Sequence, residues 1–179
     1  MLHQNATRTL TDWRPPDIDQ EALRREFLLH LAAFDDALWR GCGAGHLTGS
    51  GIVVSHDESE VALVFHPRVQ KWVQPGGHCE PTDETLAAVA LREATEETGV
   101  MGLVVDDWPL ELDIHPFECP KGSANRHLDV RYRCVAPKGS LVVRSDESVE
   151  VRWFDIDALP EPIAPSARRA IERLSRRSG

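Results

Sequence analysis

The sequence predicts an α/β fold, specifically an α/β sandwich with a mixed sheet and an extra helix before it. Strand-like segments lie on both sides of one helical segment, a second helical pattern closes the chain, and a third precedes the first strand. At 179 residues the chain suits one structural unit with a proper core. We expect an N-terminal helical extension over 1–45, the main domain over 46–162 and a C-terminal helix over 163–179.

The first helix is predicted from about Asp19 to Arg40. Its apolar residues recur at three- and four-residue steps: Leu23, Phe27, Leu31, Phe34 and Leu38. Glycines at 41, 43 and 45 then break the pattern. The helix is expected to pack either on the domain or on a partner subunit, so a homodimer is one option.

Strands are expected where short apolar runs follow polar turns. They are placed at 51–54, 61–65, 103–105, 128–135 and 149–154, and residues 71–74 lead into a glycine pair at 76 and 77. The central helical segment follows that pair and ends at Gly99. A final basic helix is expected from about Pro165 to Arg177, at the periphery.

Composition argues against several classes of protein. The formal net charge of −9 is unfavourable for broad nucleic-acid binding through a basic surface. No stretch approaches the length that spans a membrane, and the N-terminus lacks the basic start and apolar run of a signal peptide. The cysteines show no Cys-x-x-Cys spacing, so we expect neither a disulfide framework nor a zinc knuckle, and a reduced, cytoplasmic protein.

The central helix carries the clearest chemical signal. Glu93, Glu96 and Glu97 stand at i, i+3 and i+4, so they share one face within one turn. Exposed carboxylates so close repel one another by a few tenths of a kcal/mol per adjacent pair. A hard divalent cation reverses this repulsion, because it prefers carboxylate and phosphate oxygens together. The pattern therefore indicates metal-assisted attack of water on a phosphate chain.

Acidic clusters on helices are most often solvated faces, but the context differs here. An apolar stripe lies beside the acidic one, so the helix can pack that face against the core. The stripe consists of Ala87, Ala90, Leu91 and Ala94. Asp83 is predicted as the N-cap, and Gly99 suits the C-terminal end. The two glycines before the helix let the backbone approach a ligand, since they carry no Cβ.

This segment resembles the Nudix box, whose pattern is G-x5-E-x7-R-E-U-x-E-E-x-G-U, with U an aliphatic residue. The second half matches at Arg92, Glu93, Ala94, Glu96, Glu97, Gly99 and Val100. The first half holds one extra residue, so either Asp83 or Glu84 replaces the first glutamate of the box. We place the extra residue in the loop, because an insertion in the helix would rotate everything after it by about 100°. The Nudix fold that the box implies is an α/β/α sandwich with a mixed sheet.

The resemblance implies a role for each matching residue. Glu93 and Glu97 would be the principal ligands of Mg²⁺ or Mn²⁺, and the carbonyl of Gly76 would be a backbone ligand. Glu96 would be either a third ligand or a base that acts on the attacking water. Arg92 would pair with the neighbouring carboxylates and fix their orientation.

Many members of this family draw a further catalytic glutamate from a loop near the end of the domain. Glu147, in an acidic loop before the last strand, is the best candidate here, with Glu150 second. Acidic loops are most often only solvated, so this assignment depends on the resemblance alone.

The resemblance also implies a substrate in which a nucleoside diphosphate is linked to another moiety. Its phosphates need cations beyond the metal ions. Strand alternation places His127 and Arg131 on one face, where both could meet phosphate, and Arg68 and Lys71 are alternatives. The other interpretation of Arg131 is that it pairs with Asp129 or with a helix carboxylate.

Two functions remain open on the sequence. One is metal-dependent hydrolysis of the pyrophosphate, and the other is a catalytically silent module of the same fold that senses a nucleotide. All three helix glutamates are present, which favours the enzyme. The histidines show no His-x-x-x-His spacing and so do not indicate a zinc site. No signature outside the box selects a particular nucleotide-type substrate.

Overall fold

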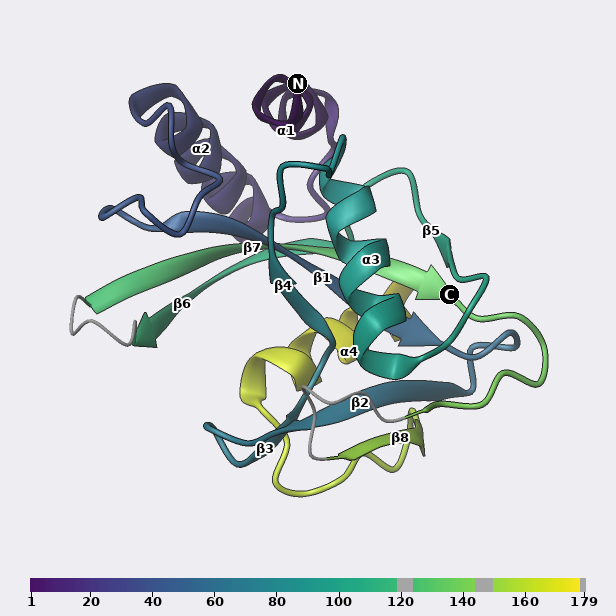
Figure 1. Cartoon of the computed structure of the whole chain (residues 1–179). Helices are drawn as coiled ribbons and strands as arrows, with labels where there is room; N and C mark the ends of the chain where they lie inside the picture. The colour runs from purple at the N-terminus through teal and green to yellow at the C-terminus, as the bar shows by residue number, and fades with distance from the viewer. Residues whose placement is uncertain (119–123, 144–149, 178–179) are drawn as a thin grey trace.

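The computed structural model describes residues 1–118, 124–143 and 150–177, and one mixed sheet with helices on both faces forms its centre (Figure 1). The helices are α1 (Leu2–Asp12), α2 (Ile18–Ala33), α3 (Leu86–Thr98) and α4 (Pro165–Arg177). The strands are β1 (His46–Val54), β2 (Glu60–His66), β3 (Lys71–Val73), β4 (Gly76–His78), β5 (Val104–Val105), β6 (Glu111–Glu118), β7 (Ala124–Val135) and β8 (Glu150–Asp155). The predicted fold class is confirmed.

The sheet is mixed because its two central strands run parallel. β1 pairs with β7 in parallel, from His46 opposite His127 to Val54 opposite Val135, and the other described strand pairs are antiparallel. The strands follow the order β3-β2-β1-β7-β5, with β4 beside β1, β6 beside β7 and β8 beside β2. Side chains of β1 and β7 therefore lie at the centre of the molecule.

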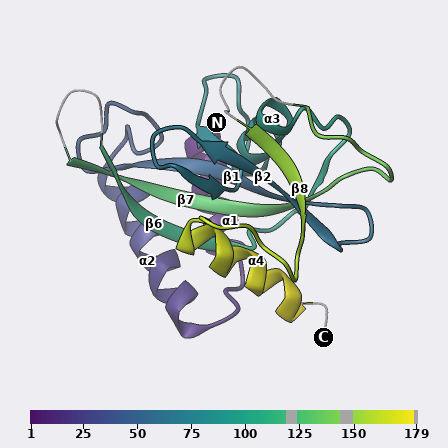
Figure 2. The ribbon, with the colours of Figure 1, turned by 90° about the horizontal axis from the view of Figure 1, so that it is seen from below.

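The two faces of the sheet have different coverings, as the views of Figures 1 and 2 show. Odd-numbered residues of β1 face α3: a Cβ on Gly49 would lie 2.8 Å from Val89 Cγ1, so this glycine lets the helix lie against the strand. Even-numbered residues face the other way, where Ile52 and Val54 pack with Ile171 and other residues of α4. The helix with the glutamates is thus fixed on one face, and α4 covers the other.

The N-terminal extension forms two helices that pack on the domain and share an apolar cluster with α3. One apolar cluster joins residues of all three helices: Leu2, Ala6, Leu10, Phe27, Leu31, Leu86 and Val89. Packing of the predicted helix on the domain is therefore observed, and a homodimer stays a prediction. Among the helices that the structure describes, we find no candidate for a membrane span.

Some boundaries differ from the prediction. α2 ends at Ala33 and not near Arg40, because Phe34 is extended (φ −133°, ψ 113°) and two aspartates that favour turns follow it. The buried side chains of Ala37 and Leu38 reach the core from turns instead. Helix α1 and the strands β3, β4 and β6 were not predicted from the sequence, whereas α4 begins and ends as predicted.

Candidate functional site

Helix α3 is held at both ends by its local sequence. Thr85 is the N-cap, and its hydroxyl accepts a hydrogen bond of 3.0 Å from the N–H of Ala88. The prediction that Asp83 caps the helix is wrong, because its carboxylate is bonded elsewhere. Gly99 ends the helix in the left-handed conformation, with φ 68°, as predicted. These ends set the register in which the glutamates face outward from the core.

Arg92 connects the charged residues of α3 to the preceding segment. Its guanidinium donates to the two carboxylate oxygens of Asp83, at 3.2 and 3.1 Å, and to the carbonyl of His78, at 2.8 Å. It also donates to Glu93 at 2.9 Å and to Glu96 at 3.2 Å. Burial acts to lower the pKa of Arg92, but the bonds with Asp83 and Glu93 outweigh burial and raise it. Arg92 therefore stays charged and holds its neighbours in orientation.

The two acidic residues in the first half of the box have different surroundings. The side chain of Asp83 is 5% exposed, and it also accepts a hydrogen bond of 2.7 Å from the N–H of Glu80. Glu84 is exposed and borders a surface hollow near Met1. Asp83 is thus the residue beside Arg92. Helix α3 starts at Leu86, after both acidic residues, and the loop position of the extra residue stays a prediction.

Strand β4 brings its backbone against two of the glutamates. The N–H of Gly76 donates to Glu97 Oε2 at 3.0 Å. A Cβ on Gly77 would lie 2.5 Å from Glu93 Oε1, so any other residue would displace the Glu93 carboxylate from its observed position. The side chain of Glu93 is 12% exposed, whereas that of Glu96 is 59% exposed. Glu93 and Glu97 therefore lie at the junction of α3 and β4, and Glu96 lies toward solvent.

This set of oxygen donors fits a hard divalent cation, because carboxylate and carbonyl oxygens are the ligands that Mg²⁺ and Mn²⁺ prefer. The three glutamates share one face without meeting at one point. Within the described residues, ligand atoms of three side chains lie within 4.8 Å of one another only at His46, His78 and His127. The glutamates are held by Gly76 and Arg92 instead, and their flexible side chains allow them to turn toward an ion.

Arg131 lies in the interior, on the face of the sheet opposite α3. Its side chain is 0% exposed and donates to Asp129 at 2.8 Å, to Glu111 at 2.8 Å and to Asp113 at 3.0 Å. Burial acts to lower the pKa of Arg131, but the three carboxylates raise it. The pairing with Asp129 is the interpretation that the sequence left open. It argues against a contact with phosphate, because the charge is already neutralised.

His127 is buried in the same face of the sheet. Burial, followed by the neighbouring His78, lowers the pKa of His127 to about 3. The ring is therefore neutral at neutral pH and offers phosphate no positive charge.

The remaining predicted residues lie at the surface or outside the described residues. Arg68 is exposed in the turn between β2 and β3, and Lys71 is half-buried at the start of β3. Glu147 lies outside the described residues. Glu150 is half-buried and forms an ion pair with Arg152. The assignment of Glu147 therefore stays a prediction, and Glu150 is paired with Arg152.

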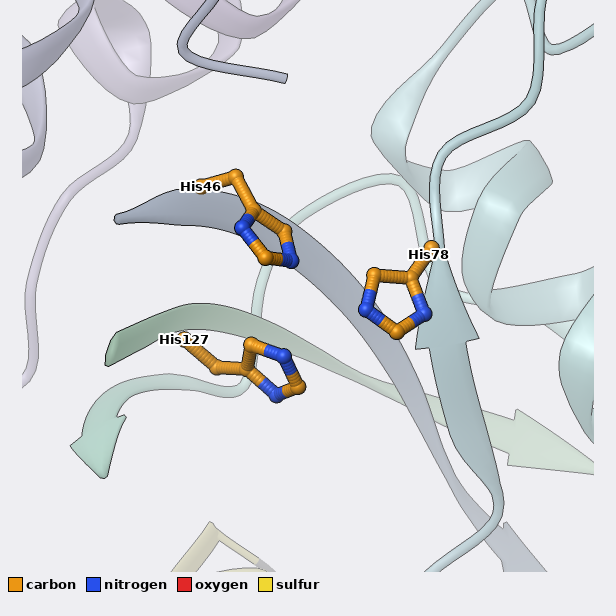
Figure 3. Close-up of side chains that lie close together, drawn as sticks. All are labelled: His46, His78 and His127. Atoms are coloured by element: carbon orange, nitrogen blue, oxygen red, sulfur yellow. The ribbon is translucent and has the colours of Figure 1, made fainter. Parts of the chain in front are cut away.

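The structure also brings together three histidines that show no common pattern in the sequence. His46 lies in β1, His78 in β4 and His127 in β7, and their rings face a common space (Figure 3). The signal that could have found them is the strand register, since His46 is paired directly with His127. That register is not visible in any local pattern of the sequence.

Comparison with known proteins supports the assignment of the Nudix box. The model of the NUDIX domain matches residues 45–174. The chain therefore belongs to the Nudix family. NAD-capped RNA hydrolase NudC of Stutzerimonas stutzeri (strain A1501) is 31% identical over an alignment of 166 residues, which covers 84% of this chain and 54% of that protein. The chain thus spans about half the length of this curated relative.

Solved structures show the same fold. An Ap4A hydrolase from C. elegans gives a TM-score of 0.59 at 15% identity, over 74% of this chain and 96% of that one. The NUDIX domain of Shewanella oneidensis NrtR, complexed with ADP ribose, gives 0.57 at 24% identity, over 84% of this chain and 97% of that one. At these identities the likeness establishes the fold alone, and it confirms the Nudix-type sandwich.

Proposed function

We propose that this protein is a metal-dependent hydrolase that cleaves the pyrophosphate of a nucleoside diphosphate linked to another moiety. The observation that carries the proposal is the junction of α3 and β4, where Glu93 and Glu97 lie against the backbone of the glycine pair. Membership of the Nudix family and the similarity to a hydrolase support the class of reaction.

In this proposal the residues at the junction of α3 and β4 have different roles. Glu93, Glu97 and the carbonyl of Gly76 hold Mg²⁺ or Mn²⁺, which when bound supplies positive charge to the phosphate oxygens. Glu96 is exposed and serves either as a third ligand or as the base that accepts a proton from the attacking water. Arg92 keeps the carboxylates oriented through its bonds to Glu93 and Glu96.

The substrate class is proposed from the relatives. NudC is a hydrolase of NAD-capped RNA, and the NrtR domain is complexed with ADP ribose. NAD and ADP-ribose both contain a nucleoside diphosphate joined to a second group. Arg68 and Lys71 remain the proposed cationic contacts of its phosphates. The net charge of −9 makes the nucleotide part a more favourable partner than an extended nucleic acid. We also propose a cytoplasmic location, supported by the buried thiols of Cys79 and Cys134, which form no disulfide.

A panel of substrates tests the proposed function. NAD, ADP-ribose, Ap4A, a nucleotide sugar and an NAD-capped oligonucleotide are incubated with Mg²⁺ or Mn²⁺, and released nucleoside monophosphate is measured by chromatography. We expect cleavage of at least one compound, abolished by EDTA. Tight binding of a nucleotide with no cleavage of any compound would instead support the silent sensing module. Faster cleavage of the capped oligonucleotide than of NAD would contradict the expectation that no nucleic acid is a partner.

Asp83→Asn is expected to lower kcat/KM for the best substrate of the panel by about 10- to 100-fold, the usual effect of losing a group that orients a ligand. The reason is that Asp83 bonds Arg92, which in turn holds Glu93 and Glu96. Glu84→Gln is the matched control, because Glu84 is exposed and neighbours Asp83 in the chain. Equal losses in both variants would show that the contact with Arg92 has no part in orienting the site.

A further inference from the structure

Three histidines on three strands form a compact cluster outside the proposed hydrolytic site. A ligand nitrogen of each of His46, His78 and His127 lies within 4.8 Å of the others. The ring centroids are 5.0 Å apart for His46 and His78, 4.9 Å for His46 and His127, and 5.0 Å for His78 and His127. The nearly equal separations are those of three donors arranged around one point (Figure 3).

His46 gives an independent sign that a ligand belongs there. Its side chain is 0% exposed, and neither Nδ1 nor Nε2 has a hydrogen-bond partner. A buried polar group without a partner costs about 1–3 kcal/mol. A metal ion that takes the lone pair of one ring nitrogen would remove part of this cost, and it would explain why a polar ring stands at the start of a buried strand.

The sheet holds the three rings in place. His46 is paired with His127 in the parallel register of β1 and β7, and His78 is paired with Thr48, two residues further along β1 on the same face as His46. All three residues therefore lie on strands of one sheet, where backbone pairing limits their movement. A site built on strands positions its ligands more closely than one built on loops.

The cluster is separated from the glutamates by β4. The Cβ position of Gly77 faces Glu93, and successive residues of a strand point to opposite faces, so His78 points away from that carboxylate. The two groups also differ chemically, since imidazole nitrogens suit zinc and neighbouring transition metals, whereas carboxylates suit magnesium and manganese.

We propose that His46, His78 and His127 bind a transition-metal ion of the zinc class, in addition to the divalent ions of the helix glutamates. Zinc–nitrogen bonds of about 2.0–2.1 Å place tetrahedral ligand nitrogens about 3.4 Å apart, so binding needs only a small closure of the rings. Three protein ligands leave one tetrahedral position for water or a further ligand. His78 is the half-buried member of the cluster, and His46 and His127 are buried.

Zinc binding can be measured without any substrate. The full chain is stripped of metal, excess Mg²⁺ is added to occupy carboxylate sites, and Zn²⁺ is titrated by calorimetry while Co²⁺ is followed by its visible absorption. We expect one equivalent of Zn²⁺, a raised Tm, and the intense absorption of tetrahedral Co²⁺. His46→Gln, His78→Gln and His127→Gln are each expected to weaken zinc binding by about a hundredfold or more, beyond the loss from an outer-shell residue.

Two controls make the result specific. His66→Gln removes a histidine of β2 that lies outside the cluster, and Glu97→Gln removes a proposed ligand of the other site, so both are expected to bind zinc like the parent. Far-UV circular dichroism checks that each variant is folded, and three separate cluster variants guard against the failure of any one. The proposal is overturned if the parent takes up no zinc beside Mg²⁺, or if the cluster variants bind it as tightly as His66→Gln does.

Discussion

Glu97→Gln is expected to lower turnover on the order of a thousandfold while the protein folds like the parent. Positive charge from a bound divalent ion is worth several kcal/mol in such reactions, and each 1.36 kcal/mol is tenfold in rate. Glu97 lies at the junction of α3 and β4, where its Oε2 accepts the hydrogen bond of the Gly76 N–H. The amide of glutamine keeps the shape and one acceptor oxygen, so the change removes charge with little disturbance of packing.

The measurement is kcat at saturating substrate and metal, with the Tm of the same samples as the check on folding. Glu172→Gln is the matched control, because Glu172 is an exposed helical glutamate on α4, away from the junction. It is expected to keep the parental rate. If Glu97→Gln hydrolyses every panel compound as fast as Glu172→Gln, then Glu97 is not a ligand and the proposed site is wrong.

The elements that the sequence predicted well are those whose pattern is local. The box helix combines an apolar stripe, a glycine at its C-terminus and acidic residues on one face, and the structure places α3 at Leu86–Thr98. The final helix, Pro165–Arg177, has a strong amphipathic pattern and was predicted with the same ends. The N-cap was missed because Asp83 and Thr85 are both good capping residues, and the choice depends on the distant guanidinium of Arg92.

The features that the sequence could not give depend on strand register. Whether Arg131 faces phosphate or carboxylates is decided by β6, which places Glu111 opposite Arg131 and Asp113 opposite Asp129. Strand β6 itself was missed. The three histidines likewise become neighbours only when β1, β4 and β7 are paired. Such contacts join residues far apart in the chain, and no window of sequence contains them.

Arg131 is also the residue with the largest expected effect on stability. Asp129 is fully buried and accepts hydrogen bonds from Arg131, Thr48 and Ser50 at 2.8, 3.0 and 2.8 Å. Burial would raise the pKa of Asp129, but Arg131 outweighs burial and lowers it. Glu111 has a second cation, Arg173, at 3.1 Å. Asp129 therefore depends most on Arg131 for compensation of its charge.

The pH dependence follows from these directions. The folded-state pKa of Asp129 is lowered, and that of Asp113 is lowered to about 2, against a burial effect, by His115 and Arg131. Their contribution to stability is complete above 3.8, the ordinary pKa of an aspartate, and is lost as the pH falls through the folded-state values. Without Arg131, the effect of burial on the pKa of Asp129 dominates and raises it. Protonation of Asp129 then removes the cost of burying its negative charge. The difference in stability between the parent and a variant that lacks Arg131 should therefore shrink as the pH falls toward that window.

Arg131→Met is expected to lower the free energy of unfolding by about 3–5 kcal/mol at neutral pH, the cost of leaving buried carboxylates uncompensated. Equilibrium unfolding in urea measures it. Arg133→Met is the matched control on the same strand, because Arg133 is 28% exposed and pairs with Asp106 and Glu58 near the surface, so its loss should cost about 1 kcal/mol or less. Arg131→Lys keeps the positive charge but lacks the forked N–H donors of the guanidinium. Its loss of unfolding free energy should therefore lie between the losses of the two Met variants. If Arg131→Met were as stable as the parent and raised the KM more than Arg133→Met does, Arg131 would instead be a residue that contacts the substrate.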